Sequence, residues 1–190
     1  MIRDDLLYSP VGKLVSATLS FTLMALVFSW QTSAVLVYAI AAHEWGHVWA
    51  ARYLGLPTAG FVIEPFGGAS LILHSRHWDE VFISSMGPAF GLASAVPLVV
   101  IHAVTGNQWW GVMAFYVLLI NFVNLLPIWK LDGGRLANAL FYNSKSWHWD
   151  AQLNAKGLMV GRILYASLIV AYLATITVLS RFVIIDVLKF

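Results

Sequence analysis

The sequence predicts an all-α polytopic membrane protein with about five, or six, transmembrane helices and a membrane-reentrant β-hairpin at about residues 60–73. Three observations lead to this fold class. The 190-residue chain is 60% hydrophobic and only 11% charged, and its mean hydropathy of +0.78 lies outside the range of ordinary soluble domains. Apolar runs of about 20 residues, the length that crosses about 30 Å of hydrocarbon, recur along the chain. The basic residues divide unequally between the two sides that these runs define.

The five apolar runs lie at residues 14–30, 34–54, 81–104, 111–131 and 158–180. Residues 134–143 predict a short helix, and a polar loop follows at residues 144–156. Residues 181–190 either extend the last helix or lie on the membrane surface. Because no segment is long and polar enough for a separate soluble module, residues 1–190 are expected to form a single membrane domain.

A hairpin is predicted between the second and third runs, at residues 58–73. This apolar segment is too short to span the membrane twice, and Pro65-Phe66-Gly67-Gly68 breaks its middle between two β-prone arms. Non-helical backbone is tolerated at membrane depth only where protein buries it or where it lines a wet cavity. The hairpin is therefore expected to line such a cavity.

The basic residues predict the orientation of the chain. With a cytoplasmic N-terminus, only Arg181 and Lys189 of the 11 Lys and Arg residues fall on the outer side, in agreement with the positive-inside tendency. We therefore expect an integral protein of the cell (plasma) membrane with a cytoplasmic N-terminus. The basic residues form no cluster of the kind that nucleic-acid binding requires, so no nucleic-acid partner is expected.

A metal-binding pattern, His43-Glu44-Trp45-Gly46-His47, lies inside the second run. Side chains at positions i and i+4 share one face of a helix, so the two imidazoles can bind a single zinc ion. Glu44 lies close enough to reach a water on that metal, as in the His-Glu-x-x-His arrangement of metalloproteases. The alternative is a polar cluster that holds helices together, although a glutamate inside lipid is costly without a role.

Asp132 is the candidate for a third ligand. A catalytic zinc ion takes three protein ligands and leaves one position for water, and the chain has no cysteine. Most other acidic residues occupy terminal or loop positions, whereas Asp132 follows a run that Asn124 and Pro127 interrupt. A straight helix would carry Asp132 past the depth of His43, so we expect the chain to unwind near Pro127. The alternative role for Asp132 is the N-cap of the helix that follows it.

These motifs together resemble those of the site-2 proteases, a family of intramembrane zinc metalloproteases. The resemblance covers the His-Glu-x-x-His pattern, the Pro-Phe-Gly-Gly turn, Gly87-Pro88 and the motif Asn124-x-x-Pro127-x-x-x-Leu131-Asp132-Gly133-Gly134, all in family order. It departs at Gly91, where the family often has asparagine. The chain resembles a minimal form of the family, without a PDZ or CBS module.

The resemblance implies a role for each site residue. His43, His47 and Asp132 are the expected ligands of one Zn²⁺ per chain, and Glu44 is the expected general base. Asn124 is expected to contact the substrate or the developing oxyanion, with an interhelical hydrogen bond as its alternative role. Independently of the resemblance, the hairpin offers an edge with which an extended substrate strand can pair, so Gly67 and Gly68 are expected to bind substrate.

The expected reaction is hydrolysis of peptide bonds in membrane-associated or single-span proteins, that is, regulated intramembrane proteolysis. The expected partners are a transmembrane or membrane-anchored protein substrate and the lipid bilayer, and assembly into a homo-oligomer stays open. The active-site side is expected to be cytoplasmic, since the second and fourth runs both end there. The alternative is a non-enzymatic membrane protein, such as a metal transporter or an inactive relative that acts as a chaperone.

Overall fold

The computed structural model describes residues 6–65, 67–72, 77–128, 130–141 and 155–187. Within these ranges the fold is mostly helical, with six α-helices, one short 3-10 helix and one two-stranded sheet. In chain order the elements are η1 (Leu6–Tyr8), α1 (Pro10–Val27), α2 (Trp30–Tyr53), β1 (Thr58–Glu64), β2 (Gly67–Ile72), α3 (His77–Thr105), α4 (Gln108–Asn124), α5 (Asp132–Phe141) and α6 (Ala155–Val187).

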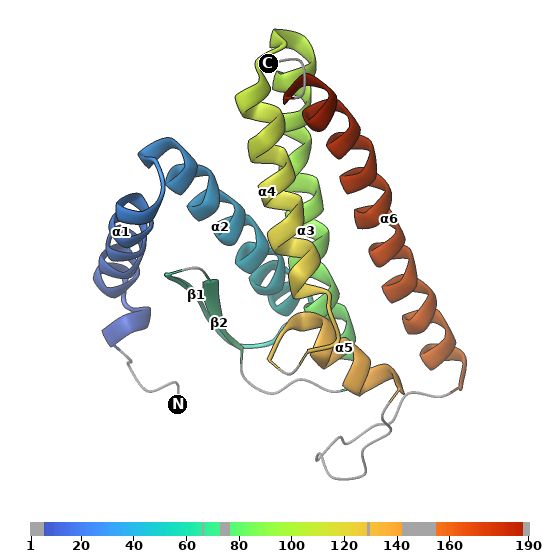
Figure 1. Cartoon of the computed structure of the whole chain (residues 1–190). Coiled ribbons are helices and arrows are strands. Elements are labelled where there is room, and N and C mark those ends of the chain that lie inside the picture. Colours follow the sequence, from blue (N-terminus) through green and yellow to red (C-terminus); the bar gives the residue numbers. More distant parts are fainter. Residues whose placement is uncertain (1–5, 66, 73–76, 129, 142–154, 188–190) are drawn as a thin grey trace.

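The helices form two groups that meet at one end of the molecule (Figure 1). α3, α4 and α6 pack side by side, and the largest cluster of buried apolar side chains lies mainly between them. α2 leans against α3, and α1 packs against α2 and the hairpin. The short helix α5 lies at the end of α3 where α2 also arrives, which brings α2, α3, α5 and the hairpin together (Figure 1).

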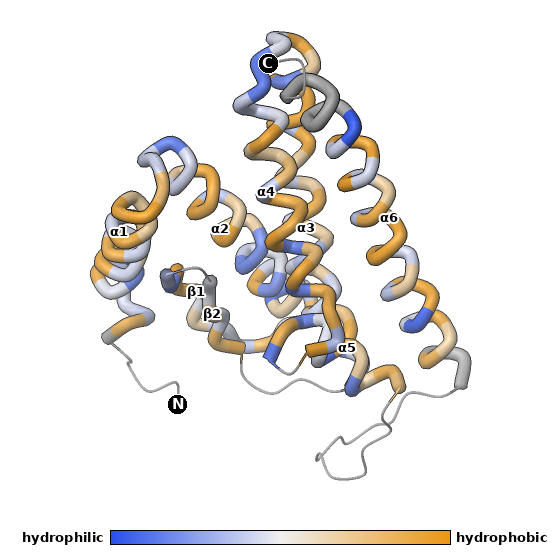
Figure 2. The backbone as a smooth tube through the Cα atoms, viewed as in Figure 1, coloured by the Kyte–Doolittle hydropathy of each residue, from blue (hydrophilic) through white to orange (hydrophobic). Residues whose placement is uncertain are grey.

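Three helical segments are long and apolar enough to cross a membrane among the described residues: Pro10–Val27, Trp78–Thr105 and Leu158–Arg181. They coincide with the first, third and fifth predicted runs. Large apolar side chains on them face outward, with Leu26 79% and Val104 80% exposed, and Figure 2 shows long hydrophobic stretches on α3 and α6. Lipid rather than water is the solvent that such surfaces fit. That α2 and α4 also span stays a prediction, since α4 has only 17 residues and α2 carries the polar motif.

The fourth predicted run ends earlier than expected. The prediction that this helix extends to residue 131 is wrong, because α4 ends at Asn124. Pro127 has no N–H to donate, and its ring would clash with the carbonyl of Val123 if the helix continued. The last turn tightens instead, and the N–H groups of Leu125 and Leu126 donate to carbonyls three residues back. The expected unwinding near Pro127 is thereby confirmed, and the short helix predicted at residues 134–143 lies at Asp132–Phe141.

The hairpin predicted at residues 58–73 is confirmed as two antiparallel strands, with Glu64 opposite Gly67 and Phe61 opposite Ser70. Its depth in the membrane stays a prediction. Polar side chains of α1 bind the outer edge of β1: the Lys13 ammonium donates to the Ala59 carbonyl (2.6 Å), and the Ser20 hydroxyl donates to the Ile63 carbonyl (2.9 Å). Two backbone carbonyls on the outer edge of β1 are therefore hydrogen-bonded to α1.

Candidate metal centre

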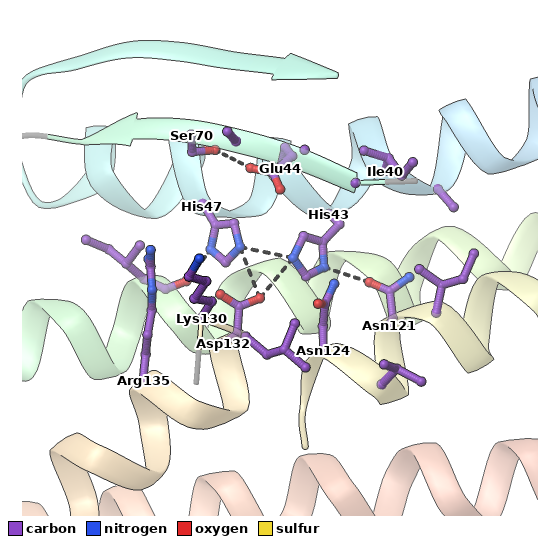
Figure 3. A pocket seen from close by; sticks show the side chains of 18 of the residues that line it. Ile40, His43, Glu44, His47, Ser70, Asn121, Asn124, Lys130, Asp132 and Arg135 are labelled. Atoms are coloured by element: carbon purple, nitrogen blue, oxygen red, sulfur yellow. Dashed lines mark hydrogen bonds and ion pairs between the residues drawn. The ribbon is translucent and has the colours of Figure 1, made fainter. Parts of the chain in front are cut away.

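Two helices bring the three predicted ligands together. His43 and His47 lie one turn apart on α2, and Asp132 is the first residue of α5. The Asp132 Oδ2 lies 2.9 Å from the His43 Nε2 and 3.3 Å from the His47 Nε2, and the two Nε2 atoms lie 3.1 Å apart. All three side chains are buried and converge on one point (Figure 3).

The spacing of these three atoms fits a zinc ion. A tetrahedral zinc with bonds of about 2.0–2.1 Å holds its donor atoms about 3.3 Å apart, close to the distances between the Nε2 and Oδ2 atoms. Two imidazole nitrogens and one carboxylate oxygen are also a donor set that zinc accepts, and they leave a fourth position open. The buried carboxylates of Asp132 and Glu44 add two negative charges, which a divalent cation would balance.

Each imidazole is oriented by a hydrogen bond at its other nitrogen. The His47 Nδ1–H donates to the Ile83 carbonyl of α3 (2.8 Å), and the His43 Nδ1–H donates to the Asn121 Oδ1 of α4 (2.7 Å). A proton fixed on Nδ1 leaves the Nε2 lone pair free for a metal. From the sequence alone, the position of Asn121 one turn before Asn124 favours a structural role.

Glu44 lies beside the ligands and under the hairpin. Its carboxylate and the ligand nitrogens of His43 and His47 lie within 4.8 Å of one another. The Ser70 hydroxyl of β2 donates to the Glu44 Oε2 (2.5 Å), as Figure 3 shows. A Cβ added to Gly68 would collide with the Glu44 side chain, so β2 reaches this carboxylate only because Gly68 has no side chain. Ser70 was not predicted from the sequence, because no local sequence pattern links it to Glu44.

A cavity of about 610 Å³ opens onto these groups. It is lined by the ligands and Glu44, by residues of β2, and by residues at the end of α4 and the start of α5. The predicted substrate-binding residues Asn124, Gly67 and Gly68 all line it, together with Lys130 and Arg135. The Asn124 side chain makes no hydrogen bond to another residue within the described ranges, and it points toward the histidines (Figure 3). The interhelical hydrogen bond that was the alternative role for Asn124 is therefore not formed there.

Comparisons with known proteins agree on one family. Residues 104–168, which include Asp132 but neither His43 nor His47, match peptidase family M50. The chain is 32% identical over 126 residues to the stage IV sporulation protein FB of Bacillus subtilis, covering 64% of this chain and 44% of that protein. It is 22% identical over 117 residues to the zinc metalloprotease MJ0392 of Methanocaldococcus jannaschii, covering 58% of this chain and 34% of that protein. The chain thus spans less than half the length of these two relatives.

Proposed function

Because the chain belongs to the site-2 proteases, peptidase family M50, an integral membrane family of zinc metalloproteases, we propose that it is an intramembrane zinc protease. Its substrates would be membrane-associated or single-span proteins. The observation that carries this proposal is the convergence of two histidines, Asp132 and Glu44 on one cavity, in a chain whose other helices are apolar on the outside. Residues 1–190 would form one such domain.

His43, His47 and Asp132 would hold one zinc ion per chain through their Nε2 and Oδ2 atoms. Zinc in such a site supplies Lewis acidity, which acidifies a water molecule and polarises the scissile carbonyl. The Glu44 carboxylate then accepts the proton of the attacking water and donates it to the leaving amine. The Asn124 side-chain amide, which makes no hydrogen bond among the described residues, would donate to the developing oxyanion.

The hairpin supports a binding mode for an extended substrate. The two edge strands of the sheet differ. Lys13 and Ser20 of α1 bind the outer edge of β1, whereas residues of β2 line the cavity. A substrate helix must unwind before its carbonyls can be attacked, and the unwound strand would pair with β2. Pairing there places the strand beside Glu44, since Ser70 of β2 contacts its carboxylate.

The central experiment is reconstitution of the full chain in liposomes with a panel of single-span substrates, with and without zinc. We expect cleavage that a chelator abolishes and that added zinc restores, with the cut located by mass spectrometry. Glu44→Gln should retain zinc and lose cleavage by about two to four orders of magnitude, since it removes the proton acceptor. Unchanged cleavage by the Glu44→Gln variant would contradict the proposal. Zinc binding without cleavage of any substrate would favour the non-enzymatic alternative.

A second variant tests the binding mode. A Cβ at Gly67 meets no protein atom within 4 Å, whereas one at Gly68 collides with Glu44. Gly67→Val should therefore leave zinc content unchanged and raise KM, because only an incoming strand would meet the new side chain. Gly68→Ala should instead lower kcat by displacing Glu44. Unchanged KM in the Gly67 variant would argue against strand pairing at β2.

A further inference from the structure

We propose that Asn121 is the positioning residue for His43. We also propose that the Asn121 side chain can reach His43 from α4 only because Gly91 has no side chain. The proposal rests on the zinc site proposed above. The Asn121 side chain is 1% exposed and lies on α4, while His43 lies on α2. Figure 3 shows the Asn121 amide pointing at the imidazole from the side opposite Asp132.

The direction of the hydrogen bond follows from the two ends of the amide. The Asn121 Nδ2 donates to the Val117 carbonyl (2.8 Å), and a carbonyl can only accept. The Oδ1 is therefore the atom that faces the His43 Nδ1 at 2.7 Å, so the imidazole carries its proton on Nδ1. The Nε2 is then unprotonated and directed at the point where the Asp132 Oδ2 also lies, 2.9 Å away.

Packing against α3 prevents the amide from turning. A Cβ added to Gly91 would fall onto the Oδ1 and Cγ atoms of Asn121, so the Asn121 side chain fills the space that a residue at position 91 would occupy. Gly91 is itself buried. A rotated amide would place Nδ2 against Nδ1–H and Oδ1 against the Val117 carbonyl, two repulsive pairs in a buried site.

The two histidines are thus positioned differently. His47 is held by the Ile83 carbonyl, a backbone group that no substitution removes. His43 is oriented by a side chain, so a single substitution of Asn121 can remove the hydrogen bond that orients it. Without the Asn121 acceptor, the Nδ1–H of His43 loses its partner in a buried site, and the Nε2-protonated tautomer, which cannot bind the metal through Nε2, becomes accessible.

The test measures zinc affinity of the purified full chain by competition with a chromogenic chelator. Asn121→Leu, which has the same branched shape and no acceptor, should lower zinc affinity by about 10–100-fold. Asn121→Asp, whose carboxyl oxygen can still accept from the His43 Nδ1–H, should retain most of it. Asn124→Leu is the matched control on the same helix: it should lower cleavage and leave zinc affinity unchanged.

A second experiment exchanges the small and the amide residue between positions 91 and 121. Gly91→Asn alone should weaken zinc binding through the clash, and Asn121→Ala alone should weaken it through the lost acceptor. The double variant Gly91→Asn/Asn121→Ala brings an amide to the same place from α3 and should bind zinc more tightly than either single variant, a non-additive effect. A merely structural role of Asn121 predicts that the two defects add.

Folding is followed separately by the Tm of the zinc-free protein. Wild-type zinc affinity in a folded Asn121→Leu variant, or additive defects in a folded double variant, would overturn the proposal. If Asn121→Leu does not fold, Asn121→Ala, which also lacks the acceptor, and the double variant decide in its place. Zinc binding that responds as expected in a protein that cleaves nothing would leave this inference intact and contradict the proposed function, so the two can fail independently.

Discussion

At the scale of single residues, His43, His47 and Glu44 each have a hydrogen-bond partner in the candidate site. The Nδ1–H groups of His43 and His47 donate to the Asn121 side chain and the Ile83 carbonyl. The Glu44 carboxylate accepts a hydrogen bond from the Ser70 hydroxyl. Buried polar groups are costly when unpaired, so these partners stabilise the arrangement before any ligand arrives. The same partners fix the directions in which the reactive atoms point.

The contact between Ser70 and Glu44 predicts an effect on catalysis rather than on metal binding. Ser70→Ala removes a hydrogen bond to a carboxylate, worth about 1.5–3 kcal/mol, and should lower kcat by about tenfold because Glu44 loses its orientation. Zinc affinity should stay unchanged, and Ser70→Thr, which keeps the hydroxyl on a strand residue, should behave as wild type. Steady-state kinetics and zinc titration check this; unchanged kcat in the alanine variant would remove Ser70 from the mechanism.

At the scale of elements, the end of α4 decides where Asp132 lies. The helix stops at Asn124, and the Tyr165 hydroxyl of α6 donates to the carbonyl of Leu125 just beyond it (2.6 Å). A Cβ on Gly133 would collide with that same carbonyl, so the chain can fold back only with glycine there. The turn between α4 and α5 is therefore built by Pro127, Gly133 and a residue of α6 together.

The turn predicts that Pro127→Ala weakens the site. Alanine restores the backbone N–H and removes the clash with the preceding turn, so α4 can continue and draw Asp132 away from the histidines. We expect zinc affinity to fall by tenfold or more, roughly the scale of losing a well-placed ligand partner. Pro97→Ala is the matched control, because Pro97 lies inside α3 and lines no part of the cavity; a similar loss in both variants would refute this explanation.

At the scale of the whole molecule, the site lies at one end of the helices rather than at their middle. α5, the hairpin and the N-terminal ends of α3 and α6 gather there, while the start of α4 lies at the opposite end (Figure 1). The charge distribution predicts that the end with the site is cytoplasmic. Substrates would then be cut in the cytoplasmic half of the membrane.

This orientation can be tested directly because the chain has no cysteine, so a single introduced thiol reports one position. Leu7→Cys, exposed beside α1, should react with a membrane-impermeant maleimide only after cells are opened. Thr105→Cys, exposed at the far end of α3, should react in intact cells. Labelling by mass shift checks both, and the reverse pattern would place the site on the outer side.

The sequence by itself determined the features that depend on local geometry. His43, Glu44 and His47 could be assigned to one cluster because the period of an α-helix places residues four apart on one face. The hairpin at Thr58–Glu64 and Gly67–Ile72 followed from the turn residues between two β-prone arms. The break after Asn124 followed from Pro127, whose chemistry excludes a continuous helix.

Asp132 was already predicted as the third ligand, but only the tertiary structure decided how distant groups meet. It brought the Asp132 Oδ2 to 2.9 Å from His43, and it supplied Asn121 and Ser70 as partners of His43 and Glu44. These contacts join α2 to α4, α5 and β2, and no periodicity in the sequence encodes them. They arise because side chains of segments far apart in the chain fill one another's spaces, as Asn121 fills the space beside Gly91.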